Sequence, residues 1–338
     1  MKKKLLTALQ VLVTVGILCW VFHDPQKRAE MWQALMHAKP SWLVVGFICY
    51  GIVELLAALR WYILMRVQGI RLPLWRVGAL FMLGIFFNTF MPGATGGDVL
   101  KVFFLFKEIP DKKEGGLLAV LMDRLIGLTG LIIISSVIVS LNYHWLSSTP
   151  QSRHLTWVLM AILASGLGGI TLSFLISGFK LAHKLPEKMP LRDKLIDTSK
   201  AYHAYALAWP SSLSSLVLSW GVHLFSFSVF ICAARALSIN IPALELLTVM
   251  PIILTISAMP ISVGGTGVRE GLFAMLLGPL CGVNAGDAIT LSLTGFMLTG
   301  AWAVIGGGIY LFYRSSDHRK LSDVERQVHE VEHEVAEN

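Results

Sequence analysis

The sequence of 338 residues contains little charge. Only 14% of its residues are Asp, Glu, Lys or Arg, whereas 55% are hydrophobic and the mean hydropathy is +0.66. In soluble domains about a quarter of the residues are charged. The composition therefore excludes a soluble core and predicts an all-α polytopic membrane protein.

Cysteine and acidic residues are also scarce. The four cysteines lie in or beside apolar runs and include no C-x-x-C pair, a pattern that suggests neither a disulfide framework nor a cysteine metal cluster. We expect neither a metal nor a cofactor. The 28 basic residues outnumber the 21 acidic ones and give a net charge of +7. A membrane protein acquires this excess through the Lys/Arg bias of its cytoplasmic loops, so we do not expect nucleic acid as a partner.

Two breaks rich in Pro and Gly interrupt the apolar chain with the same spacing. Each contains Met-Pro, a pair of glycines four and five residues past the proline, and a basic residue nine past it. These residues are Pro92, Gly96, Gly97 and Lys101 in the first break, and Pro260, Gly264, Gly265 and Arg269 in the second. Proline ends the incoming helix and glycine permits a sharp reversal, so the two prolines are the predicted hinges.

The apolar runs beside each break are too short to cross a bilayer alone, since a full span needs ~20 residues. A break within hydrocarbon is tolerated only where protein or a water-filled cavity covers it. We expect the next short helix to begin at the glycine pair and to point its free N–H groups at an anion in the bend. The alternative is two ordinary spans kinked by Pro and Gly. The matched spacing and the charges of Asp98, Lys101, Arg269 and Glu270 favour the cavity.

The remaining apolar runs predict about six full spans. They cover residues 5–22, 42–65, 115–141, 155–179, 211–234 and 288–313. We interpret 77–106 and 244–278 as re-entrant broken helical hairpins that enter from opposite faces and form an inverted repeat, an arrangement typical of transporters with a midplane site.

This topology can be tested by counting basic residues, because cytoplasmic loops hold most of them. It places 19 Lys and Arg inside, five outside and four in membrane elements. Residues 180–209 form a basic amphipathic segment on the cytoplasmic surface. We expect the chain in the inner (cytoplasmic) membrane of the cell, with both termini in the cytoplasm.

The predicted substrate site gathers polar and charged residues around both bends. It contains Arg60, Asn88, Gly96, Gly97, Asp98, Lys101, Asp123, Arg124, Gly264, Gly265, Arg269 and Glu270. Arg60 has two interpretations, since its long side chain either extends to the nearby cytoplasmic surface or lines the cavity. This mixture of charges suits a lipid phosphate that carries a cationic or sugar substituent.

The domain boundary is predicted near residue 313. Residues 1–313 form a membrane translocator-like domain, and 314–338 form a cytoplasmic tail with apolar residues at helical spacing. This spacing predicts a helix with one of three roles: it pairs with a second copy, binds a partner synthase or lies on the membrane. His329 and His333 match the zinc pattern H-E-x-x-H. Val331 between them belongs to the apolar stripe and no third ligand is visible, so we interpret the match as an ordinary charged helix.

Three stretches suggest a family: Met91 to Lys101, Asp123-Arg124, and Pro260 to Glu270. They resemble the lysylphosphatidylglycerol synthase transmembrane family, the membrane half of the multiple peptide resistance factor and its stand-alone relatives. The resemblance extends to about residue 314 and implies a flippase-like role. In the two-part relatives a separate soluble domain transfers the aminoacyl group. This sequence ends without such a domain, so the resemblance does not imply aminoacyl transfer by this chain.

Three functions remain open. Translocation of an anionic phospholipid or lipid-linked head group explains the two broken elements and the buried charges. A membrane-embedded head-group transferase is the second, with Asp98 or Asp123 as a general base. The third is a scaffold for a partner synthase, held through the tail. We favour translocation, and therefore do not expect an enzyme.

Overall fold

A computed structural model describes residues 32–33, 36–90, 96–178, 204–257 and 265–315. Outside these residues lie the expected first span, most of the basic segment 180–209 and the tail 314–338 except Arg314 and Ser315, which end α13. Both hinges, Pro92 and Pro260, and the first glycine of the second pair, Gly264, also lie outside them. Asp98 belongs to a described helix, but its side chain is not described.

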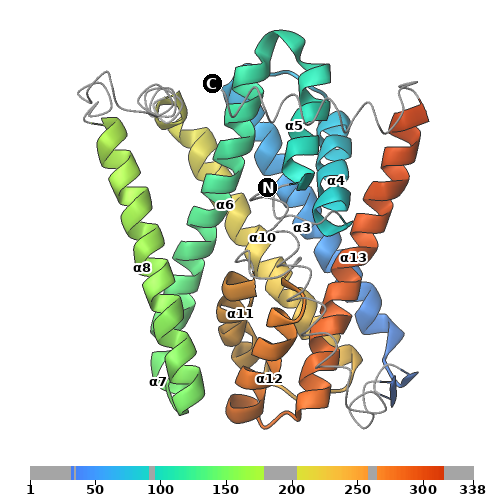
Figure 1. Ribbon diagram of the computed structural model, residues 1–338, viewed down its shortest axis with the longest axis vertical. Helices are drawn as coiled ribbons and strands as arrows, with labels where there is room; N and C mark the ends of the chain where they lie inside the picture. Colours follow the sequence, from blue (N-terminus) through green and yellow to red (C-terminus); the bar gives the residue numbers. More distant parts are fainter. Residues whose placement is uncertain (1–31, 34–35, 91–95, 179–203, 258–264, 316–338) are drawn as a thin grey trace, which may run out of the picture.

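The described residues form helices joined by short turns (Figure 1). The helices are α3 (Pro40–Val67), α4 (Leu74–Phe90), α5 (Gly96–Glu108), the 3-10 turn η1 (Pro110–Lys112), α6 (Lys113–Leu141), α7 (Tyr143–Leu146), α8 (Pro150–Gly178), α10 (Trp209–Ala236), α11 (Ala243–Ser257), α12 (Val268–Cys281) and α13 (Ala285–Ser315). Pro40 and Pro150 are the first residues of α3 and α8. Proline suits this position because the first N–H of a helix has no partner within the helix.

Among the described residues, four helices are long and apolar enough to span a membrane. They are α3, the η1–α6 unit, α10 and α13. The 28 residues of α3 extend about 42 Å at 1.5 Å per residue, which exceeds the ~30 Å hydrocarbon core. α8 is not among these four, but it has 29 residues and covers all but the last residue of the expected span 155–179.

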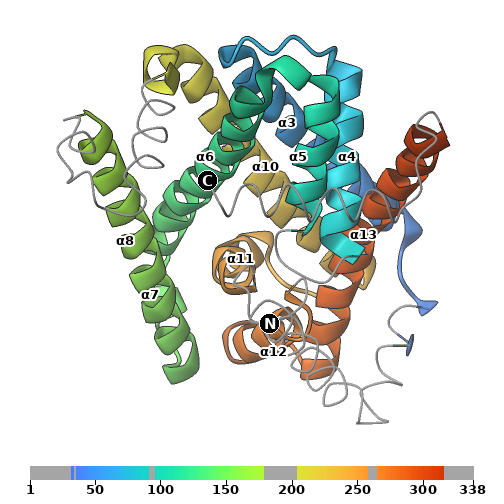
Figure 2. The ribbon, with the colours of Figure 1, turned by 45° about the horizontal axis from the view of Figure 1, so that its top comes forward.

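Apart from the short helix α7, the remaining helices are two pairs of intermediate length. α4 and α5 have 17 and 13 residues, and α11 and α12 have 15 and 14. At these lengths each extends only about 20–26 Å, less than the hydrocarbon thickness. The α4–α5 pair lies in one half of the molecule and the α11–α12 pair in the opposite half (Figures 1 and 2).

The helix after the first break begins where the sequence predicts, since α5 starts at Gly96. The prediction for the second break is wrong, because α12 starts at Val268 and not at the glycine pair. Gly265 and Gly267 have φ angles of +72° and +86°, so the turn continues for three more residues. A Cβ at Gly265 would lie 2.6 Å from the carbonyl oxygen of Ser257, which makes glycine necessary there.

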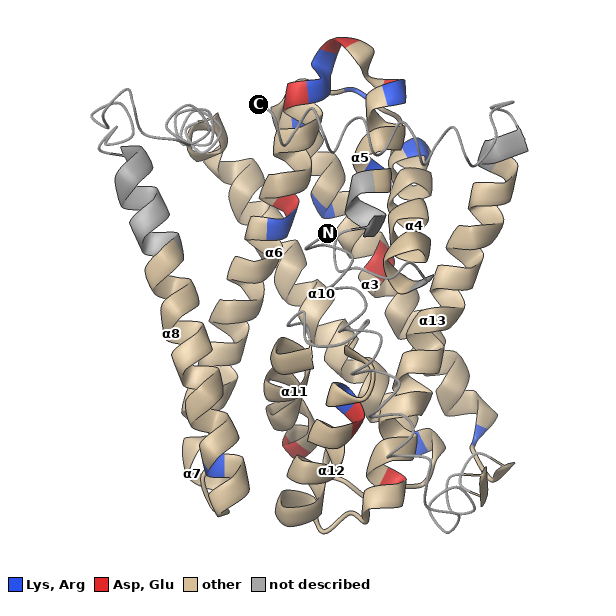
Figure 3. Ribbon diagram, viewed as in Figure 1, with Lys and Arg blue, Asp and Glu red and all other residues tan. Residues whose placement is uncertain are grey.

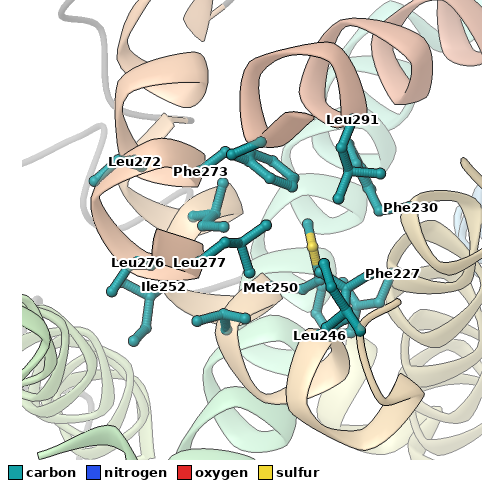
Figure 4. Packing of buried hydrophobic residues seen from close by; sticks show 14 of the residues in the cluster. Phe227, Phe230, Leu246, Met250, Ile252, Leu272, Phe273, Leu276, Leu277 and Leu291 are labelled. Carbon is teal, nitrogen blue, oxygen red and sulfur yellow. The ribbon is translucent and has the colours of Figure 1, made fainter. Parts of the chain in front are cut away.

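Each helix pair is fixed by its own apolar cluster. The cluster of α10, α11 and α12 contains Phe227, Phe230, Met250 and Phe273, whose side chains pack together in Figure 4. The cluster of α4 and α5 contains Trp61, Leu83, Phe103, Phe104 and Tyr310. Both clusters also include residues of the long helices α3, α10 or α13, so each short pair is attached to a spanning helix.

Small residues let the helices approach closely, as is usual for membrane helices. A Cβ at Gly306 of α13 would overlap the backbone carbonyl of Met82 in α4. A Cβ at Gly130 of α6 would lie 2.6 Å from the Cβ of Ser219 in α10. These contacts hold α4 against α13 and α6 against α10.

Candidate functional site

A cavity of about 440 Å³ is lined by residues of both helix pairs and of three long helices, α3, α6 and α13. Its wall is formed by α3, α4, α5, α6, α12, α13 and the turn before α12. The volume lies in the usual range of small-ligand sites, ~300–1,000 Å³. Many charged residues lie near the ends of the molecule, but some lie away from the ends, on α3, α6 and α12 (Figure 3).

The first group of charges in this wall is organised around Asp123 of α6. Arg60 Nε donates a hydrogen bond of 2.7 Å to Asp123 Oδ1, and Lys101 Nζ lies 3.9 Å from Oδ2. Arg60 Nη1 also donates to Ser219 Oγ at 2.9 Å. The three charged residues are 4–7% exposed. Because an unpaired buried charge is costly, the carboxylate is what makes both cations tolerable here.

Lys101 is held from a second direction by aromatic rings. Its Nζ lies 3.8 Å from the centroid of the Trp61 ring and 4.3 Å from that of Phe81. Such cation–π contacts are attractive and leave the charge in place. α3, α4, α5 and α6 therefore all contribute to the position of one ammonium group.

The second group of charges lies at the start of α12. Arg269 Nη2 donates to Glu270 Oε1 at 2.7 Å, and Arg269 Nε donates to Ser292 Oγ at 3.1 Å. Ser292 in turn donates to Glu270 Oε1 at 3.1 Å. The guanidinium carbon of Arg269 also lies 4.4 Å from the centroid of the Phe296 ring.

Glu270 also caps its own helix. It is fully buried, and its Oε2 accepts a hydrogen bond from the backbone N–H of Gly267. This is the capping interaction expected of an acidic residue three positions into a helix. The helix N-terminus that the sequence predicts to be open for a ligand is thus partly occupied by the protein's own carboxylate.

The cavity brings together many of the residues predicted from the sequence. Its wall contains Arg60, Asn88, Lys101, Asp123, Arg124 and Arg269. Of the two interpretations of Arg60, the structure shows the cavity position, since its guanidinium is buried against Asp123. Glu270 lies behind Arg269 and does not line the cavity. Gly96 and Gly97 begin α5, and Gly265 lies in the turn before α12.

Several residues of the site were not in the predicted set. Glu54 of α3 lines the cavity and is only 6% exposed. An acidic residue inside an apolar span is a signal that identifies it. Ser219 and Ser292 carry no such signal, because serine is common in membrane helices and their partners become apparent only in the fold.

The sequence is similar to known proteins over most of its length. A family described as "Lysylphosphatidylglycerol synthase TM region" matches residues 7–308, which include both breaks and every residue that lines the cavity. A "UPF0104 membrane protein" of Methanothermobacter thermautotrophicus is 22% identical over 285 residues, or 78% of this chain and 81% of that protein. The chain belongs to the lysylphosphatidylglycerol synthase TM region family and is a membrane protein.

Proposed function

We propose that the protein translocates an anionic phospholipid, or another lipid-linked anionic head group, across the cytoplasmic membrane in the manner of a flippase. The observation that carries this proposal is the cavity wall that joins Lys101, from the first broken element, to Arg269, from the second. A phosphate is a natural ligand of lysine and arginine side chains that line one cavity.

The proposed path depends on the two short helix pairs. In this proposal α4–α5 enters from the cytoplasmic face and α11–α12 from the outer face, and both turn back near the bilayer midplane. Both termini are cytoplasmic. Neither pair crosses completely, so a head group between them is reached from each side in turn. Support comes from the short helices and from their location in opposite halves of the molecule.

The ion pairs of the site suit a ligand that must leave again. Asp123 and Glu270 keep Lys101 and Arg269 compatible with burial when no lipid is bound. An arriving phosphate shares these cations with the resident carboxylates and does not fill an empty site. Binding is then moderate, as transport requires.

The geometry around Asp123 argues against this residue as the general base of a head-group transferase. A general base must accept a proton from its substrate. The Asp123 carboxylate already accepts the Arg60 hydrogen bond and lies beside Lys101. We therefore propose movement of the lipid without formation or cleavage of a covalent bond. Pairing with a synthase or a second copy through the tail remains a prediction, because the tail lies outside the described residues.

Reconstitution in proteoliposomes tests this function. Phosphatidylglycerol with a fluorescent label on its acyl chain is placed in one leaflet, and its appearance in the other is followed with an impermeant quencher. We expect the protein to accelerate equilibration while the mass of the lipid stays constant. Lys101→Gln should slow it, whereas Lys113→Gln, which alters an exposed lysine outside the cavity, should not. Failure of the wild-type protein to accelerate equilibration, or a new lipid mass, would contradict the proposal.

A further inference from the structure

One carboxyl group on the cavity wall takes no part in the two ion-pair groups. Glu54 lies on α3 with 6% of its surface exposed, and it lines the cavity. It interacts with Tyr50, one turn earlier on the same helix, and with the charge of Lys101. Among the described residues, no Lys or Arg forms an ion pair with it.

This distinguishes Glu54 from the other two buried acids at the site. Asp123 has a guanidinium nitrogen at 2.7 Å, and so has Glu270. A bonded cation fixes a carboxylate in its charged form. The charge of Glu54 is not fixed in this way, so this carboxyl group is free to gain or lose a proton as the contents of the cavity change.

The groups around Glu54 determine what changes its charge. The charged and titratable groups of the surrounding elements are Tyr50 and Arg60 on α3, Lys101 on α5, Asp123 and Arg124 on α6, and Arg269 on α12. The described cavity residues of α4 and α13 are uncharged. On α10, His223 is not among the residues that line the cavity, and its Nε2 lies 3.0 Å from the carbonyl oxygen of Gly127.

A phosphate attracted by these cations becomes an anion beside Glu54. The ammonium group of Lys101 already has one anion nearby, the carboxylate of Asp123. A bound phosphate adds a second negative charge near the same ammonium group. Two neighbouring anions disfavour each other, and a carboxylate relieves the repulsion by binding a proton. Binding of the head group and protonation of Glu54 therefore favour one another.

We propose that Glu54 takes up one proton when an anionic head group enters the cavity and releases it when the head group leaves, so that lipid and proton move together. This inference rests on the proposed function of the same cavity. The proton comes from water on the accessible side, binds one Glu54 oxygen and returns to water on the other side. A phosphodiester carries one negative charge, so the pair is neutral and a pH gradient drives it, whereas a membrane potential does not.

The first test measures binding to the purified protein in detergent. The probe is short-chain phosphatidylglycerol, whose phosphodiester does not titrate between pH 6 and pH 8.5. Because the head group binds best beside a protonated Glu54, affinity should fall as pH rises, by up to tenfold per pH unit for one linked proton. In Glu54→Gln the affinity should not depend on pH. His223→Gln should retain the dependence of the wild-type protein.

The same binding reaction gives a readout that needs no variant. In weakly buffered solution, addition of the probe to wild-type protein should remove one proton from solution per bound lipid, as followed with a soluble pH dye. Binding without proton uptake would overturn the inference. So would a pH dependence that persists in Glu54→Gln and disappears in Asp98→Asn.

The second test measures transport in proteoliposomes with a pH gradient. Labelled phosphatidylglycerol should move faster toward the alkaline side than toward the acidic side, with no response to an imposed potential. Glu54→Gln should move lipid equally in both directions. If the wild-type protein moves lipid without responding to the gradient, the proton inference fails and the proposed function stands. If it neither binds nor moves anionic lipid, both fail.

Discussion

Asp123 illustrates how a single residue makes a charged cavity possible in an apolar protein. Its two oxygens face Arg60 at 2.7 Å and Lys101 at 3.9 Å, and all three side chains are buried. The side chain of Arg60 also passes close to Gly127, where a Cβ would lie 2.9 Å from Nη1. The absence of a side chain at position 127 thus leaves room for the ion pair.

Asp123→Asn should strongly destabilise the protein, because it leaves two buried cations without their carboxylate. Loss of one partner of a buried ion pair costs about 3–5 kcal/mol. The free energy of unfolding in detergent measures the effect, with the exposed Asp111→Asn as a control. The double change Arg60→Gln with Asp123→Asn should recover part of the loss. Wild-type stability of Asp123→Asn would show that the two cations do not depend on this carboxylate.

At the residue scale, the sequence predicts which charged residues line the cavity better than it predicts how they pair. Lys101 and Arg269 follow from their fixed spacing after the two prolines. The Arg60–Asp123 pair joins residues 63 positions apart, and its geometry depends on how α3 packs against α6. Local spacing on one helix does not contain that information.

At the scale of elements, the two breaks have the same pattern but different local structures. α5 begins at its glycine pair, whereas α12 begins three residues after Gly265. The additional glycine at 267 adopts a positive φ, and Glu270 caps the helix from within. The sequence predicts that a helix follows each break, but the start of the second depends on this capping interaction.

Gly265→Ala tests the second turn. The backbone at this position has φ +72°, where an L side chain costs about 1–2 kcal/mol, and a Cβ would lie 2.6 Å from Ser257 O. We expect a loss of at least this free energy of unfolding, together with weaker binding of the head group. Gly271→Ala, in α12, is the matched control because its Cβ meets nothing within 4 Å. Equal effects of the two substitutions would be evidence against a specific turn at Gly265.

At the scale of the whole molecule, hydropathy predicts the long helices because apolar length is a local property. It does not predict which of them line the cavity. That selection follows from contacts such as those of α4 with α13 and of α3 with α10, which depend on the shapes of distant side chains. The order of basic loops further predicts that residues 107–114 face the cytoplasm and that 142–153 face the outside.

Labelling of single cysteines tests this orientation. Lys113 and Ser148 are exposed and lie in these two loop regions. In a cysteine-free protein in intact cells, an impermeant thiol reagent should label Ser148→Cys and should not label Lys113→Cys until the membrane is opened. Labelling of Lys113→Cys from outside would show the opposite orientation and would contradict the proposed entry of α4–α5 from the cytoplasmic face.

The central claim is that cations from both broken elements bind one head group. Lys101→Gln and Arg269→Gln each remove one charge-assisted hydrogen bond to it, worth about 1.5–3 kcal/mol, or roughly tenfold to a hundredfold in affinity. Because both side chains act on the same phosphate, their effects should not add. A double-mutant cycle on the affinity for short-chain phosphatidylglycerol, in correctly folded protein, measures this coupling directly. We expect weaker binding in each single variant and a clear departure from additivity in the double variant. Unchanged affinity in the single variants, with simple additivity in the double variant, would contradict a shared site.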